Sequence, residues 1–157
     1  MPLAEFVPFV PEIFLAVAAF TLLLVGIPLR QRRIRAISVL ATTALLATAV
    51  LVFILARPVT ESRLILGDML VIDEMAVFFK LLLAIASVVT VLMAGGFLER
   101  SGYGGGEFTS LVLCATLGMY IMVSGANLAS LYVGLELMAL SVYVLVGYFK
   151  LELKSNE

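Results

Sequence analysis

The chain has 157 residues, of which 63% are hydrophobic and 13% are charged, with a formal net charge of −1. Ordinary soluble domains carry about 25% charged residues, so this composition indicates an integral membrane protein and argues against a soluble enzyme. The nearly balanced charge provides no basic surface for nucleic acid, and the one cysteine, Cys114, can neither form an internal disulfide nor bind an iron–sulfur cluster alone.

Five apolar segments along the chain predict five transmembrane helices. They cover residues 10–29, 37–56, 75–98, 108–124 and 128–149. Each is close to the length of about 20 residues that a helix needs to cross a bilayer. Helices are expected because backbone groups exposed to lipid must satisfy their own hydrogen bonds. The alternating segments of about 10 residues that a membrane barrel requires do not occur, so the predicted fold class is an all-α membrane protein.

The basic residues predict how these helices are oriented. Seven of the ten Lys and Arg residues lie on one side of the predicted spans, namely Arg30, Arg32, Arg33, Arg35, Arg100, Lys150 and Lys154. The opposite side holds Arg57 and Arg63. Positive charge accumulates on the cytoplasmic side, so the C-terminus is expected inside and the N-terminus outside. No Lys or Arg precedes Arg30, and the first segment is therefore predicted to be a retained helix rather than a signal peptide.

The connections between the spans carry three local signals. Apolar stretches flank Gly67 and Asp68, which predicts a short hairpin there. The glycine-rich residues 101–106 are interpreted as a flexible cytoplasmic turn, since no Lys-Ser or Lys-Thr pair follows to make a phosphate-binding loop. Asn127 is placed to cap the last helix.

Lys80 is a charge inside the third span, about five residues from its outer end. A lysine at that depth can extend along its stem to the membrane interface, and this is the favoured interpretation. The alternative is that Lys80 belongs to an internal polar chain.

Glu136 is the charge buried deepest in an apolar segment. It lies eight positions after Leu128, or about 12 Å along a helix that would span about 33 Å in all. A carboxylate at such a depth costs about 2.5–3.5 kcal/mol on insertion scales, and residues of this kind usually take part in ion or proton movement. The other interpretation is a protonated glutamate that is hydrogen-bonded within a helix bundle.

The two faces of this last helix differ in character. At about 100° per residue, Tyr132 and Tyr143 lie within about 40° of Glu136. The two phenols either belong to a polar path with Glu136 or simply pack. Small residues lie at about 120° to 160° from Glu136 and predict a close helix contact; they are Ser130, Gly134 and Ser141.

Several stretches of the chain carry a resemblance to one known family. They are GEF at 106–108, ATLGM at 115–119, NLASLYVGLELMALSVYVLVGY at 127–148 and VIDEMAVFFK at 71–80, together with Pro11-Glu12 and the arginines that follow the first span. Together these stretches resemble subunit N of the bacterial NADH-quinone oxidoreductases, respiratory complex I. The related cation/proton antiporter subunits share the same kind of helices.

The resemblance implies an antiporter-like, proton-translocating subunit in the membrane arm of complex I, in the bacterial inner membrane. In this family the carboxylate on the fifth helix, here Glu136, is the functional one and pairs with a lysine on a broken seventh helix. NADH, FMN, iron–sulfur clusters and quinone are implied for the whole complex, with none bound by this chain. The implied partners are other membrane-arm subunits and the lipid bilayer.

Family members contain two inverted repeats, and transporters of this kind build their sites at repeat interfaces. Residues 1–98 correspond to three leading helices, and residues 99–157 correspond to the first two helices of one repeat. The chain alone is therefore not expected to pump protons. Two other functions stay open: a small independent cation/proton transporter with Glu136 at an oligomer interface, and a structural or assembly protein that does not need Glu136.

Overall fold

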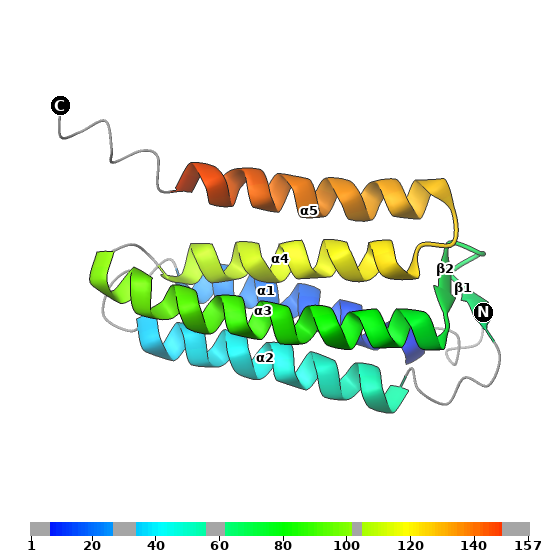
Figure 1. The fold of residues 1–157 in the computed structure, drawn as a ribbon, viewed down its shortest axis with the longest axis horizontal. Helices are drawn as coiled ribbons and strands as arrows, with labels where there is room; N and C mark the ends of the chain where they lie inside the picture. The colour runs from blue at the N-terminus through cyan, green and yellow to red at the C-terminus, as the bar shows by residue number, and fades with distance from the viewer. Residues whose placement is uncertain (1–6, 27–33, 56–61, 102–104, 149–157) are drawn as a thin grey trace.

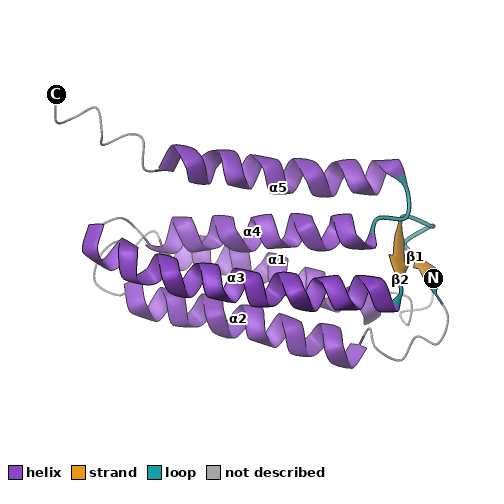
Figure 2. Cartoon of the chain, viewed as in Figure 1, coloured by secondary structure: helices purple, strands orange, loops and turns teal. Residues whose placement is uncertain are grey.

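The computed structural model describes residues 7–26, 34–55, 62–101 and 105–148. The described elements are η2 (Val7–Phe9), α1 (Val10–Gly26), α2 (Ile34–Leu55), β1 (Arg63–Ile65), β2 (Leu70–Ile72), α3 (Glu74–Ser101), α4 (Gly105–Ser124) and α5 (Leu128–Tyr148). Five helices in these ranges are long and apolar enough to cross a membrane, which confirms the predicted all-α membrane fold. They lie side by side as a bundle, with the short strands at one end (Figures 1 and 2).

The glycine-rich residues 101–106 were predicted to be a flexible turn; residues 102–104 lie outside the described residues, and the last two positions differ from the prediction. Gly105 and Gly106 form the first turn of α4, and both are buried. Both approach neighbouring helices closely: a Cβ added at Gly105 would lie 3.1 Å from the Ile34 side chain of α2, and a Cβ added at Gly26 of α1 would lie 2.5 Å from the Cα of Gly106. Residues without side chains at this crossing let the two backbones touch, so these glycines serve helix packing rather than chain flexibility.

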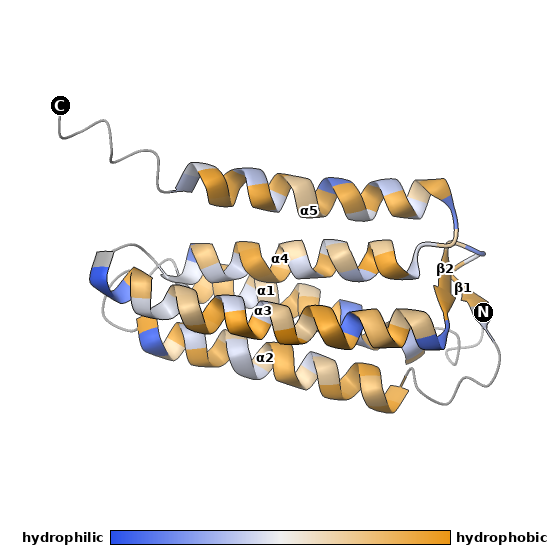
Figure 3. Ribbon diagram, in the orientation of Figure 1, coloured by the Kyte–Doolittle hydropathy of each residue, from blue (hydrophilic) through white to orange (hydrophobic). Residues whose placement is uncertain are grey.

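Helix α4 is the centre of the bundle and packs against α1, α2, α3 and α5. Its buried side chains include Leu113 and Tyr120, which join Leu15 of α1 and Leu45 of α2 in the core. Many large apolar side chains are exposed on the outside of the bundle, as expected for helices that face lipid. Figure 3 shows that apolar residues occur along all five helices.

Helix α5 stands at the edge of the bundle, beside α4 (Figure 1). Its three buried residues are the predicted small ones, Ser130, Gly134 and Ser141. Gly134 meets α4 at Gly118, because a Cβ added to Gly118 would lie 2.7 Å from the carbonyl oxygen of Gly134 and 2.6 Å from the backbone N of Met138. The small-residue contact is therefore confirmed, and α4 is its partner.

The predicted hairpin is present as an antiparallel pair, with Leu64 opposite Val71. The connection between the strands places Leu66, Gly67 and Asp68 at positive φ values of 55°, 65° and 63°. Glycine adopts this left-handed region without steric cost, and Asp tolerates it better than most residues, so the Gly-Asp pair suits the turn.

The hairpin is tied to the start of α5. The carbonyl oxygen of Met69 accepts hydrogen bonds from the backbone N of Ala126 at 2.9 Å and from the Ser130 hydroxyl at 2.7 Å. Asn127 caps α5 as predicted, since its Oδ1 accepts a bond from the backbone N of Ser130 at 2.8 Å. The position of α5 is thus set by the hairpin at one end and by α4 along its length.

Gly134→Ala should loosen the α4–α5 contact. The added Cβ would lie 2.8 Å from the carbonyl oxygen of Gly118 and from the backbone N of Met122, and overpacking of this kind costs about 1–3 kcal/mol. Energy transfer between dyes on cysteines placed at Glu107 and Val146, in a Cys114→Ser background, should fall at a lower concentration of added SDS than in the unsubstituted protein.

The matched control for this change is Gly147→Ala on the same helix. A Cβ at Gly147 meets nothing within 4 Å, and alanine favours a helix by about 0.8–1 kcal/mol over glycine. This variant should resist SDS at least as well as the unsubstituted protein. Equal behaviour of the two variants would show that the α4–α5 backbone contact does not hold α5 in place.

Candidate functional site

Two carboxylates and one lysine of the described membrane-crossing helices are the candidates for proton chemistry. Glu136 is on α5, Glu12 is near the start of α1, and Lys80 is on α3. The structure puts them in two separate places, and the chemistry of each place is different.

Glu136 lies on the half-exposed side of α5, eight residues after the helix begins. That position is about 12 Å along the helix axis. The buried residues of α5 are Ser130, Gly134 and Ser141, whereas Glu136 is partly exposed and lies on a different face of the helix. The depth confirms that Glu136 lies well inside the apolar span. It is not, however, in the core formed by the described helices.

The two predicted tyrosines accompany Glu136 on the open side of α5. Tyr132 lies one turn earlier, 62% exposed, and its hydroxyl is within hydrogen-bonding reach of the Glu136 carboxylate. Tyr143 lies about two turns further along and is 71% exposed. The structure thus brings Tyr132 to Glu136 and leaves Tyr143 on the same side as the next polar group along the helix.

Lys80 does not extend to the membrane interface, so the favoured prediction for it was wrong. Its Nζ lies 2.5 Å from Oε1 of Glu12, and the two side chains are 5% and 2% exposed. Lys80 fails to reach the interface because α1 and α4 cover its side of α3, while Glu12 supplies an opposite charge within the bundle. Its ammonium also lies 6.0 Å from the ring centroid of Tyr120.

Glu12 is the functional-site candidate that sequence reasoning missed. Pro11 and Glu12 were noted only as part of a resemblance, and the pairing partner is 68 positions away. A signal did exist. Glu12 is the third residue of α1 and Lys80 is the seventh residue of α3. Odd-numbered helices of an up-and-down bundle start at the same end, so opposite charges at similar depth on α1 and α3 are able to meet.

The Lys80 cluster is separate from the Glu136 side. Lys80 lies among α1, α3 and α4, whereas Tyr132 and Tyr143 lie on the side of α5 away from α4. The structure therefore does not bring Lys80 into one group with the two tyrosines. Within the described ranges, no group of three or more His, Cys, Asp or Glu side chains is placed to hold a metal ion.

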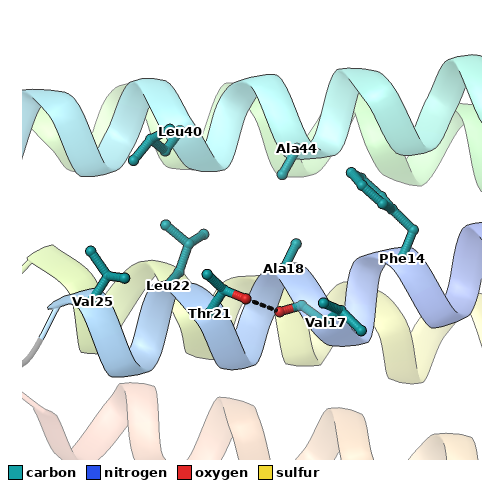
Figure 4. Close-up of a pocket in the computed structure, with 8 residues that line it drawn as sticks. All are labelled: Phe14, Val17, Ala18, Thr21, Leu22, Val25, Leu40 and Ala44. Carbon is teal, nitrogen blue, oxygen red and sulfur yellow. Dashed lines mark hydrogen bonds between the residues drawn. The ribbon is translucent and has the colours of Figure 1, made fainter.

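An apolar groove between α1 and α2 is lined by no acidic or basic side chain (Figure 4). Phe14 and Val25 lie along its α1 side, and Leu40 and Ala44 lie on the α2 side. Its one hydroxyl belongs to Thr21 and donates to the carbonyl oxygen of Val17 at 2.7 Å. The groove suits apolar contacts, and the acid–base candidates of the described chain remain the two carboxylate sites.

The chain is similar to curated proteins named NADH-quinone oxidoreductase subunit N. It is 39% identical to "subunit N 2" of Rhizobium meliloti (strain 1021) over 148 residues, which are 94% of this chain and 30% of the relative. It is 39% identical over 153 residues to the subunit N of Paramagnetospirillum magneticum, covering 98% of this chain and 31% of that protein. The corresponding protein of Rhodospirillum rubrum is 38% identical over 150 residues, again covering 31% of the relative.

The chain thus spans about a third of the length of the curated relatives it matches. A subunit N 1 of Koribacter versatilis reaches 48% identity over a shorter stretch of 88 residues. No protein-family model matches the chain.

Removing one member of the Glu12–Lys80 pair should destabilise the bundle more than removing both. Lys80→Met leaves a buried carboxylate without its cation, and breaking a buried pair costs about 3–5 kcal/mol. Glu12→Gln with Lys80→Met removes both charges at once and should recover much of that loss. The SDS concentration that half-unfolds each purified variant, followed by circular dichroism, measures the difference.

The surface pair Arg35–Glu99 provides the control for this cycle. Its closest atoms are 3.4 Å apart, and its side chains are 85% and 39% exposed. Exposed pairs contribute about 0–1 kcal/mol, so Glu99→Gln should barely move the unfolding midpoint. The two losses of stability in Glu12→Gln alone and Lys80→Met alone are added for comparison. A double variant that loses as much stability as this sum would contradict a direct Glu12–Lys80 interaction.

Proposed function

This chain is related over nearly its whole length to subunit N of NADH-quinone oxidoreductase, and we propose that it works in the proton-translocating membrane arm of such an oxidoreductase. The names of the relatives and the five membrane-crossing helices support this proposal. The whole complex would couple electron transfer from NADH to quinone with proton movement. This chain would contribute to the proton movement.

The observation that carries the proposal is the position of Glu136. It is an ionisable carboxylate at mid-depth in an apolar helix, and it lies on the side of α5 that α4 leaves open. Intramembrane carboxylates of this kind mark proton relays. The neighbouring side chains on this open side are mostly large and apolar, Val133 and Leu140 among them. In the complete subunit, further helices would cover this side and enclose Glu136.

Glu136 would act as a proton switch under the control of a nearby positive charge. Approach of a cation favours the ionised carboxylate, and its withdrawal from a dry site favours the protonated form. The resemblance to subunit N supplies the cation as a lysine on a later, broken helix of the complete subunit. Tyr132 would orient the carboxylate through its hydroxyl, and Tyr143 would extend the polar path along α5.

The redox chemistry would take place in other subunits of the complex. NADH, FMN, the iron–sulfur clusters and the quinone are assigned there, and the neighbouring membrane-arm subunits are the proposed partners of this chain. Its proposed location is the bacterial inner membrane, as a multi-pass protein. An independent transporter is the second candidate. It would need copies of the chain to associate through the open side of α5, which would place Glu136 at their interface.

The start of α1 should face the outside of the cell, since seven basic residues lie on the opposite side of the spans and two lie on this one. Single cysteines at Ser62 and Ser155, each in a Cys114→Ser background, are labelled with a membrane-impermeant thiol reagent in intact cells. Ser62 should label before lysis and Ser155 only after lysis. The reverse pattern would invert the proposed orientation.

Glu136→Gln should reduce coupled quinone reduction and proton translocation in the assembled oxidoreductase. Glutamine keeps the size and hydrogen-bonding capacity but cannot hold the transferred proton. The expected loss of activity is about tenfold or more, because a positioned proton-transfer group typically raises a rate by roughly 10²–10⁴-fold. Proton flux and quinone reduction are measured in membrane vesicles at matched abundance of the complex.

Two comparisons separate a proton site from a structural residue. Glu136→Asp retains the carboxylate with a shorter reach and should keep part of the activity. Glu74→Gln makes the same chemical change at the exposed first residue of α3 and should leave activity intact. Electron transfer to an artificial acceptor upstream of quinone should persist in all variants. Full coupled activity in Glu136→Gln would make Glu136 a structural glutamate.

A further inference from the structure

The buried Glu12–Lys80 pair contains polar atoms that the pair itself does not use. Lys80 donates to Oε1 of Glu12, while Oε2 has no hydrogen-bond partner among the described residues. The hydroxyl of Tyr120, whose ring lies beside the ammonium, also has none there. Glu12, Lys80 and Tyr120 are 2%, 4% and 0% exposed. The site is therefore enclosed, charged and only partly hydrogen-bonded.

A pair that served only to hold helices together would be built differently. Removing two charges from water is costly, and the attraction between them offsets that cost only when additional hydrogen bonds satisfy the remaining polar atoms. Apolar residues of similar volume would join α1 to α3 at lower cost in this setting. The carboxylate oxygen and the hydroxyl that have no partner among the described residues are features that a purely structural contact does not need.

We propose that Glu12, Lys80 and Tyr120 form a second intramembrane proton-binding site, at which Oε2 of Glu12 takes up the proton. The proton adds to Oε2 while Lys80 keeps its own proton on Nζ, so the charge of the pair changes from zero to +1. Release restores the carboxylate. The Tyr120 hydroxyl is the neutral polar group beside the site that can hydrogen-bond the protonated acid.

The surroundings of the site make this assignment specific. Among the described residues, the groups shown together here are Glu12 from α1, Lys80 from α3 and Tyr120 from α4, and the one charged residue of α2 is Arg35, in its first turn. Glu12 and Lys80 lie about 3–9 Å along their helices from the ends beside the hairpin. A short path to that end of the bundle is therefore enough for proton exchange.

The proposal does not depend on the function assigned to Glu136, which lies on a different helix and on the far side of α4. It can therefore fail or succeed by itself. The measurement is infrared difference spectroscopy of the complete 157-residue chain in lipid vesicles, made with ¹³C-labelled glutamate and titrated with acid. The label separates glutamic acid bands from those of aspartic acid.

Acidification should produce a protonated-carboxyl C=O band that shifts with the ¹³C label. The band should persist in Glu136→Gln and disappear in Glu12→Gln. In Lys80→Met it should already be present at neutral pH, because a buried carboxylate without its cation is neutralised by taking up a proton. If Glu12→Gln fails to fold, the neutral pair Glu12→Gln with Lys80→Met provides the band-free reference.

Tyr120→Phe tests the third member of the site without touching the ion pair. Loss of the hydroxyl should shift the frequency of the Glu12 band, since the acid loses a hydrogen-bond partner. An unchanged frequency would overturn the assignment of Tyr120. A difference spectrum that is the same with and without Glu12, or the lack of a Glu12 band in Lys80→Met, would overturn the proton site and leave a fixed ion pair.

Discussion

The low polarity of the membrane interior is the constraint on which the rest of this structure depends. A polar group that enters the bundle is costly without a partner inside it, because lipid supplies none. Lys80 meets Glu12 across two helices. Two hydroxyls of α4 also find partners: Ser110 donates to the carbonyl oxygen of Ala19 at 2.8 Å, and the Thr116 hydroxyl lies 2.7 Å from that of Ser87. Helix α4 is central because it partners polar groups on both α1 and α3.

The same constraint explains how the bundle fixes its outermost helix. Apolar side chains do not drive helices together in lipid, which is as apolar as they are, so close backbone contact and hydrogen bonds must do so. Gly118 and Gly134 provide the backbone contact between α4 and α5. The Met69 carbonyl oxygen provides the hydrogen bonds at the start of α5. These contacts together determine which side of α5 is covered by the bundle, and they leave the side that carries Glu136 partly exposed.

The two carboxylates of the spans occupy contrasting environments. Glu12 is enclosed and neutralised by a lysine within the described chain, whereas Glu136 is half-exposed and has a phenol as its neighbour. The charge on Glu12 is balanced by Lys80 within the described helices. A carboxylate on an open helix face depends on what later covers it, so its protonation can respond to a cation that moves. This difference makes Glu136 the candidate for coupling to distant events and Glu12 the candidate for a local site.

Much of this arrangement could be predicted from the sequence, because it depends on residues close together in the chain. The five spans follow from runs of apolar residues, the cap of α5 follows from Asn127, and the hairpin follows from Gly67 and Asp68. The stripe of Ser130, Gly134 and Ser141 follows from helical periodicity, and so does the depth of Glu136. All of these depend on local backbone geometry and on the length needed to cross a bilayer.

Only the tertiary structure decided which residues meet across the bundle. Lys80 could have reached the interface or turned inward, and the choice depended on a glutamate 68 positions away and on the helices that cover it. Gly105 and Gly106 have the composition of a loop, yet they begin a helix, where Gly105 packs against Ile34 and Gly106 against Gly26. Side-chain pairing and backbone contact between helices depend on how the helices are rotated and which of them are neighbours, and neither quantity is encoded in the hydropathy of a single span.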